Sequence, residues 1–168
     1  MSSSIENLLK DLPQKALEKR AESKKYFNKL KKKPRKRLDL IVQELHEEEF
    51  AQTDCLSCGN CCKTTSPIFT DKDISRIARV LKLKESSFIS QYLRRDEDDF
   101  MVLKQASCPF LGNDNACFIY ESRPKACREY PHTDRKKFIQ ITDLTLKNTE
   151  ICPAAFNIVE NLKKRLPL

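Results

Sequence analysis

Apolar residues recur at helical spacing in several separate stretches of this chain. In residues 35–51 they follow the i, i+3, i+4, i+7 spacing of one buried helical face, at Leu38, Ile41, Val42 and Leu45. Residues 4–33 carry a thinner apolar stripe among many lysines, formed by Leu17, Ala21, Phe27 and Leu30. We expect a helix in each stretch, with Pro13 in the first turn of the earlier helix and Pro34 at its end.

The remainder of the chain predicts shorter elements. Thr70 and Asp73 resemble a capping box that opens a helix, while Pro124 and Pro153 are each placed to open another. A further helix is expected around residues 88–93, and short strands around residues 66–69, 100–103 and 138–141. The apolar faces of the two longer helices are Ile74, Ile77, Ala78 and Leu81, and Phe156, Val159, Leu162 and Leu166. The predicted fold class is α-rich, mainly α with a few short strands.

Eight cysteines in 168 residues are the main candidates for chemistry. Four of them form a C-x2-C-x2-C-C run made of Cys55, Cys58, Cys61 and Cys62. The other four are Cys108, Cys117, Cys127 and Cys152. Thiolates two residues apart can converge on one ion, and Gly59 suits the tight turn between them because it tolerates positive φ. The spacing therefore predicts a metal site built from all eight thiols.

The donor set narrows the metal to zinc or iron. Only two histidines, His46 and His132, are present, so the ligands must be almost entirely sulfur. Cys108 and Cys152 are each followed by proline, as is the last ligand of a bacterial ferredoxin motif, which favours an iron–sulfur cluster mildly. Eight thiolates could divide into two four-ligand sites, with adjacent Cys61 and Cys62 pointing apart in extended chain, or form one site beside spare cysteines.

The alternative use of cysteine, in disulfides, is disfavoured by the compartment that the sequence predicts. The first residues lack the apolar segment and cleavage site of a secretory signal, so we expect a cytoplasmic, reducing location. No stretch reaches the roughly 18 apolar residues of a membrane span, and no membrane partner is expected.

Positive charge is concentrated near the start of the chain. The net charge is +8, and residues 15–37 contain twelve Lys or Arg against two Glu, so the remaining residues sum to −2. We therefore predict a basic helical N-terminal extension over residues 1–50, followed by a small metal-stabilised cysteine-cluster domain over residues 51–168. Residues 15–37 could bind an acidic partner or nucleic acid.

Several motifs occur together in a fixed order. They are Cys-x2-Cys-Gly-x-Cys-Cys, Thr-x2-Asp-Ile with Arg-Ile-Ala, Cys-Pro-Phe-Leu, and Cys-x-Ile-Tyr-x2-Arg-Pro-x2-Cys-Arg-x-Tyr-Pro. This combination, over residues 55–131, resembles the YkgJ-like cysteine-cluster family, the CxxCxxCC zinc- or iron-chelating domain that also occurs in flagellin lysine-N-methylase. The resemblance implies metal binding by the first seven cysteines, with Cys152 as a further member. Asn60 stands where the family usually has a second glycine.

Three classes of function remain open from the sequence. The first is a metal-binding protein that holds zinc or an iron–sulfur cluster. The second, suggested by the resemblance, is an iron–sulfur oxidoreductase or a protein-lysine methylase-like enzyme, although no glycine-rich phosphate loop and no catalytic set of residues stands out. The third is a nucleic-acid-associated protein that uses the basic arm.

Residues near the cysteines allow two interpretations. Arg123 and Arg128 flank Cys127, and they could either stabilise thiolates or pair with Glu121 and Glu129 on the surface. His132 is a minor candidate ligand. His46, on a charged helix, is expected to be solvated.

Overall fold

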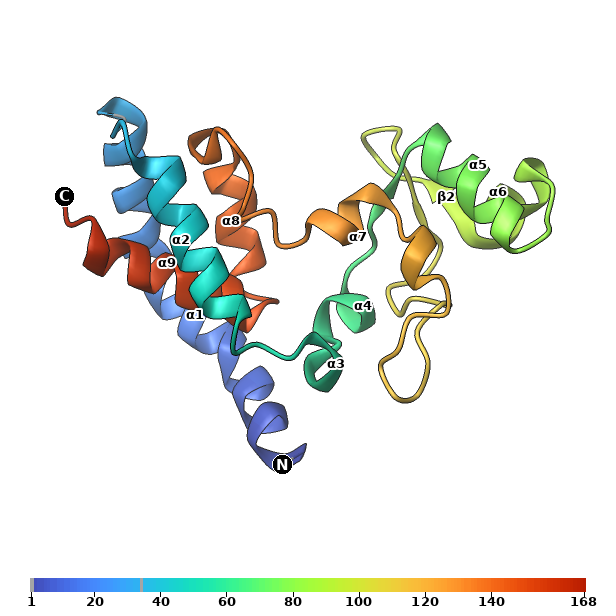
Figure 1. The fold of residues 1–168 in the computed structure, drawn as a ribbon, viewed down its shortest axis with the longest axis horizontal. Coiled ribbons are helices and arrows are strands. Elements are labelled where there is room, and N and C mark those ends of the chain that lie inside the picture. Colours follow the sequence, from blue (N-terminus) through green and yellow to red (C-terminus); the bar gives the residue numbers. More distant parts are fainter. Residues whose placement is uncertain (1, 34) are drawn as a thin grey trace. The chain divides into compact units, whose positions relative to one another are not determined.

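The computed structural model of this protein describes residues 2–33 and 35–168. It divides the chain into two compact units, Met1–Ser57 together with Pro131–Leu168, and Cys58–Tyr130 (Figure 1). Among the described residues, no helix combines the length and apolar character needed to cross a membrane. The elements are mainly helices with one small sheet, so the predicted fold class is confirmed.

The first unit is helical. Its elements are α1 (Ser2–Lys32), α2 (Leu38–Phe50), a 3₁₀ segment η2 (Phe138–Ile141), α8 (Thr142–Asn148) and α9 (Pro153–Arg165), and α3 (Cys55–Cys58) lies at its border. Helices from both ends of the chain share one core, whose fully buried members include Phe27, Leu30, Val42, Phe138, Ile158 and Leu162. The N-terminal helices therefore bury their apolar faces against the C-terminal ones.

The buried face of α1 differs from the predicted stripe. Pro13 lies inside the helix, which already runs from Ser2, so it does not mark the first turn. Leu17 is 60% exposed, whereas the buried positions are Leu12, Ala16, Ser23, Tyr26, Phe27 and Leu30. Because lysines occur all around this helix, the sequence did not distinguish one face clearly. Packing against the other helices determines which face is buried.

Residues 138–141, predicted as a strand, form the 3₁₀ segment η2. The preceding Lys137 has a left-handed backbone (φ 59°), and the carboxylate of Asp39 accepts hydrogen bonds from the backbone N–H groups of Lys137 (2.7 Å) and Phe138 (3.0 Å). This carboxylate satisfies the donors that open a helical turn. The alternating apolar pattern was too short to distinguish a strand from such a turn.

The second unit contains the only sheet within the described residues. Its elements are α4 (Asn60–Thr64), β1 (Ile68–Phe69), α5 (Asp71–Val80), α6 (Glu85–Tyr92), β2 (Leu93–Arg95), β3 (Met101–Leu103), a 3₁₀ segment η1 (Tyr120–Ser122) and α7 (Lys125–Glu129). The antiparallel strands have the order β1-β3-β2, with Ile68 opposite Val102 and Leu93 opposite Leu103. Strand β2 was not predicted, because Leu93 continues the apolar spacing of α6.

A compact apolar core holds α5 and α6 to the sheet. Its members are Phe69, Ile74, Ile77, Ala78, Phe88, Leu93, Leu103, Phe110 and Ile119. The capping box predicted at the start of α5 is confirmed, since the side chains of Thr70 and Asp73 bond to each other's backbone N–H. This core is one boundary of the segments that carry the cysteines.

Candidate metal centre

Three segments of the second unit bring cysteines to one region. Cys61 and Cys62 lie on α4, Cys108 and Cys117 lie on the two sides of a hairpin, and Cys127 lies on α7. The Sγ atoms of Cys61 and Cys62 are 4.0 Å apart. This separation is close to the ~3.8 Å between thiolates on a tetrahedral zinc with Zn–S bonds of ~2.3 Å. The backbone here is helical, not extended, so the predicted divergence of these two side chains does not occur.

Gly59 makes the turn between Cys58 and α4. Its φ of 57° is left-handed, as predicted from its place in the cysteine run. A Cβ atom at this position would lie 2.8 Å from both Cγ and Oδ1 of Asn115. Glycine is therefore required here for two reasons, the left-handed backbone conformation and the close approach of the hairpin.

Backbone hydrogen bonds tie the hairpin to α4. The N–H of Cys108 donates to the carbonyl of Cys62 at 2.9 Å. Within the hairpin, Gly112 N–H donates to the Ala116 carbonyl and Phe118 N–H to the Phe110 carbonyl, each at 2.8 Å. These bonds fix Cys108 and Cys117 close to Cys62, although a long stretch of sequence separates them.

Four thiols, those of Cys62, Cys108, Cys117 and Cys127, act on one another electrostatically. The hydrogen bond with Cys61 lowers the pKa of Cys62 to about 7 against the opposing effect of burial, and the charges of nearby basic side chains assist it. Burial raises the pKa of Cys108 to about 11 and that of Cys127 to about 12, and the neighbouring thiols add to both shifts. These four thiols are called the thiol cluster below.

Arg123 supplies positive charge to the thiol cluster. Its charge favours the thiolate forms of Cys62, Cys117 and Cys127. Its guanidinium lies 3.5 Å from the centroid of the Tyr120 ring, and its Nε donates to the Tyr120 carbonyl at 2.8 Å. This geometry supports the interpretation of Arg123 as a thiolate-stabilising residue. Glu129, which the sequence offered as a surface partner for the arginines flanking Cys127, has its carboxylate 3.6 Å from the ammonium group of Lys125.

The cluster suits a soft cation by its chemistry. Its side-chain donors are all sulfur, which zinc and iron–sulfur clusters accept, and no disulfide joins any two of the eight cysteines. Burial penalises the thiolate forms that a metal requires, and a bound cation would offset that cost. Within residues 2–33 and 35–168, no three Cys, His, Asp or Glu side chains already stand close enough together to hold an ion. Side-chain rotation would be needed to complete coordination.

The three remaining predicted ligands are not among the five thiols of Cys61 and the thiol cluster. Cys58 ends α3 at the border of the second unit. Cys55 and Cys152 belong to the first unit, where Cys55 is exposed and the sulfur of Cys152 accepts a hydrogen bond from Ala155 N–H at 3.5 Å. The structure thus brings together five of the eight predicted ligands, Cys61 and the thiol cluster.

The histidine on α2 is not solvated as predicted. His46 is half-buried, its Nδ1 lies 2.8 Å from Oγ1 of the buried Thr133, and its ring lies 4.5 Å from that of Phe50. Its role in the described structure is packing and hydrogen bonding within the first unit.

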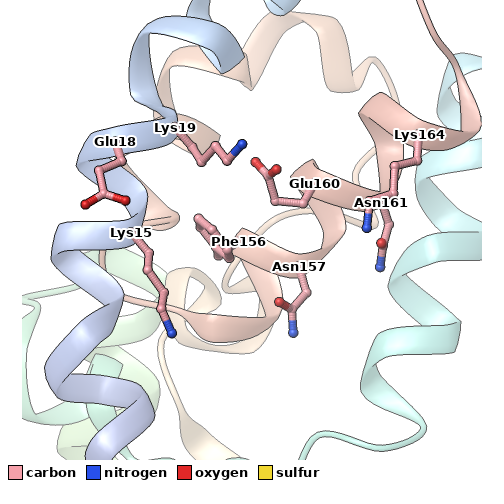
Figure 2. Close-up of a pocket in the computed structure, with 8 residues that line it drawn as sticks. All are labelled: Lys15, Glu18, Lys19, Phe156, Asn157, Glu160, Asn161 and Lys164. Atoms are coloured by element: carbon pink, nitrogen blue, oxygen red, sulfur yellow. The ribbon is translucent and has the colours of Figure 1, made fainter.

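A separate groove of about 370 Å³ lies between α1 and α9 (Figure 2). Phe156, predicted as a core residue of α9, lines this groove and is only half-buried. Lys19 and Glu160 extend toward each other across it in Figure 2. Its lining is otherwise Lys15, Glu18, Asn157, Asn161 and Lys164, so it offers no thiol or imidazole ligand.

The family model CxxCxxCC, described as "Putative zinc- or iron-chelating domain", matches residues 54–153. The chain belongs to the CxxCxxCC family. All eight cysteines fall inside the matched range, which confirms the resemblance that their spacing suggested.

One curated relative of this CxxCxxCC protein is the "Uncharacterized protein MJ0661" of Methanocaldococcus jannaschii. The two are 34% identical over 82 residues, which cover 47% of this chain and 44% of the relative. The chain therefore spans less than half the length of that relative. No solved structure matches the chain.

Proposed function

We propose that this CxxCxxCC protein binds zinc or an iron–sulfur cluster through its cysteines. The observation that carries the proposal is the gathering of four mutually interacting thiols from three segments of the second unit. The family description supports zinc or iron chelation in general. The metal would cross-link α4, the hairpin and α7, so its binding free energy would add to the stability of this unit.

Cys62, Cys108, Cys117 and Cys127 are the proposed primary ligands, with Cys61 beside them. Cys55, Cys58 and Cys152 complete the proposed set of eight ligands. On this view residues 51–168 are the metal-binding domain and residues 1–50 an extension, as the sequence predicts. When bound, the ion would supply positive charge that favours the thiolate forms. The positive charge of Arg123 has the same effect on Cys62.

Elemental analysis and visible absorption of protein purified without oxygen test this function. Zinc in a colourless sample, or iron with sulfide in a brown one, is the expected result. Cys62→Ser should lower the metal content and destabilise the second unit, whereas the matched control Thr64→Ser on α4 should change neither. Full metal content and unchanged stability in Cys62→Ser would contradict the assignment.

A second function, nucleic-acid binding, is favoured by one face of α1. Lys24, Lys25, Lys29 and Lys32 line a shallow groove of about 510 Å³ together with Ala21 and Asn28. No ion pair is formed by Lys24, Lys25 or Lys32 with any other described residue. Other lysines of α1 are paired, such as Lys31, which lies 3.0 Å from Asp143. The unpaired row extends over about 12 Å of helix.

We propose that this row contacts consecutive phosphates of a nucleic acid. Releasing counterions would make the affinity fall with salt, by a slope of roughly 0.7–0.9 per lysine involved. A triple variant, Lys24→Gln with Lys25→Gln and Lys32→Gln, should therefore reduce the slope by about 2–3. Fluorescence anisotropy with labelled RNA and DNA over a salt series measures it.

The matched control changes three lysines that are already paired. Lys15, Lys19 and Lys31 form ion pairs with Asp11, Glu22 and Asp143. Replacing these three lysines with Gln changes the net charge by the same amount as the first triple variant does. The control should retain most of the salt slope. Equal loss in both triple variants, or equally tight binding to polyglutamate, would refute a nucleic-acid face.

A further inference from the structure

We propose that Asp73 and Arg76 of α5 act as positioning residues that hold Cys127 and Arg123 at the thiol cluster. The inference rests on the proposed metal function. In the sequence, Asp73 belongs to the capping box and the Thr-x2-Asp-Ile motif, and Arg76 belongs to the Arg-Ile-Ala motif. The metal assignment gives neither residue a role. We call Asp73 and Arg76 the α5 clamp.

Asp73 is the buried centre of the clamp. Its side chain is 2% exposed, yet its carboxylate accepts four hydrogen bonds. The donors are Thr70 N–H (3.0 Å), Thr70 Oγ1 (2.7 Å), Arg76 Nη2 (2.6 Å) and the backbone N–H of Lys125 (3.1 Å). The first two belong to the cap of α5, but the last comes from the first residue of α7. A carboxylate so buried must keep its partners, so its position fixes theirs.

Arg76 donates hydrogen bonds to the segment that precedes α7. Its Nη2 donates to the carbonyl of Arg123 at 2.8 Å and to that of Ser122 at 3.3 Å, while it also pairs with Asp73. Pro124 has no N–H, so the carbonyls before it and the N–H after it are the backbone groups available for anchoring this turn. The clamp bonds to all of these groups.

The anchored groups stand directly beside those that act on the thiols. Arg123, whose carbonyl is held, places its guanidinium where its charge reaches Cys62, Cys117 and Cys127. Cys127 follows Lys125 on a helix of five residues, and its N–H donates to the Pro124 carbonyl at 3.0 Å. So short a helix has little stability of its own. The direction of the Cys127 thiol therefore depends on the clamp.

Cobalt(II) titration of the full, metal-free chain tests the clamp. Thiolate-to-cobalt charge-transfer absorption reports how many thiolates bind, and competition with a chelator gives the affinity. Arg76→Gln should weaken cobalt binding by about 10–100-fold, as loss of a ligand-orienting partner does. It should also remove about a quarter of the charge-transfer intensity, one thiolate of four. Arg79→Gln, an exposed change on the same helix, is the control and should have no effect.

A double variant separates positioning from general stability. Cys127→Ser alone should lose the same quarter of intensity, and adding Arg76→Gln to it should remove no more. Arg76→Lys keeps the charge beside Asp73 but cannot reach both carbonyls, so it should give an intermediate affinity. It also serves if Arg76→Gln does not fold.

Three results would overturn the inference. The first is a wild-type spectrum and affinity in both Arg76 variants, even with lowered thermal stability, which would leave the clamp a purely structural role. The second is further loss of intensity in the double variant, which would place the effect on other ligands. The third is a wild-type chain that binds no cobalt through thiolates, and this result would overturn the metal function itself together with the clamp.

Discussion

Replacing Gly59 with alanine tests how the turn of the cysteine run meets the hairpin. Two costs add at this site. A left-handed backbone at φ 57° costs an alanine about 1–2 kcal/mol. The new Cβ would also stand 2.8 Å from Cγ and Oδ1 and 3.2 Å from Cβ of Asn115, an overpacking that costs about 1–3 kcal/mol. We expect Gly59→Ala to destabilise the metal-loaded second unit by about 2–5 kcal/mol.

The two costs can be separated in a double-mutant cycle. Asn115→Gly removes the clashing side chain and suits the positive φ of 62° at that position. In this background the steric part of the cost should vanish, leaving about 1–2 kcal/mol for Gly59→Ala. Zinc release during urea unfolding, followed with a chromogenic chelator, reports the second unit because that unit carries the thiol cluster.

Two results of this cycle would contradict the described turn. A total cost below about 0.5 kcal/mol, the scale of an ordinary surface change, would mean that the turn is not constrained as described. The same cost in both backgrounds would mean that the hairpin does not approach Gly59 as closely as the structure has it.

Three further predictions concern ionisation and ligand number. Burial raises the pKa of Tyr26 to about 12, above the ordinary value of about 10, so the unfolded state loses this proton first. The stability that this tyrosine contributes below pH 10 should therefore be lost as pH rises through 12. Tyr26→Phe should abolish that part of the decline in urea unfolding curves. In metal-free protein, Cys62 should react with iodoacetamide with a midpoint near pH 7 and before Cys127, as peptide mass spectrometry would show, and Arg123→Gln should raise the midpoint. Cys108→Ser should lower zinc content by mass spectrometry, whereas equal zinc in the variant and the wild type would remove Cys108 from the ligand set.

Local patterns predicted much of the secondary structure. The capping box at Thr70 and the helix opened by Pro153 were visible because capping and proline effects involve residues only a few positions apart. The positive φ of Gly59 was predicted for the same reason. The strand predicted at residues 138–141 was wrong, because Asp39, distant in sequence, caps a helical turn there.

The candidate site was predicted in composition but not in arrangement. Cysteine spacing identified the ligand candidates and the family, and soft sulfur donors alone narrowed the metal to zinc or iron. The spacing could not show that Cys61 and Cys62 have neighbouring sulfurs, since that depends on the helical backbone of α4. Nor could the spacing reveal that the backbone N–H of Lys125 donates a hydrogen bond to the carboxylate of Asp73. The capping box and the Thr-x2-Asp-Ile motif were the features of the sequence that drew attention to Asp73.

What the sequence by itself determined about this protein is therefore its short-range order and its chemistry: the caps, the turns, the sulfur donors and the concentration of lysines near the N-terminus. The tertiary structure alone decided which thiols meet, which face of α1 is buried, and which basic residues stay unpaired. The physical reason is that these outcomes depend on contacts between segments far apart in the chain. Burial of apolar faces and a few buried hydrogen bonds select such contacts, and no local pattern encodes them.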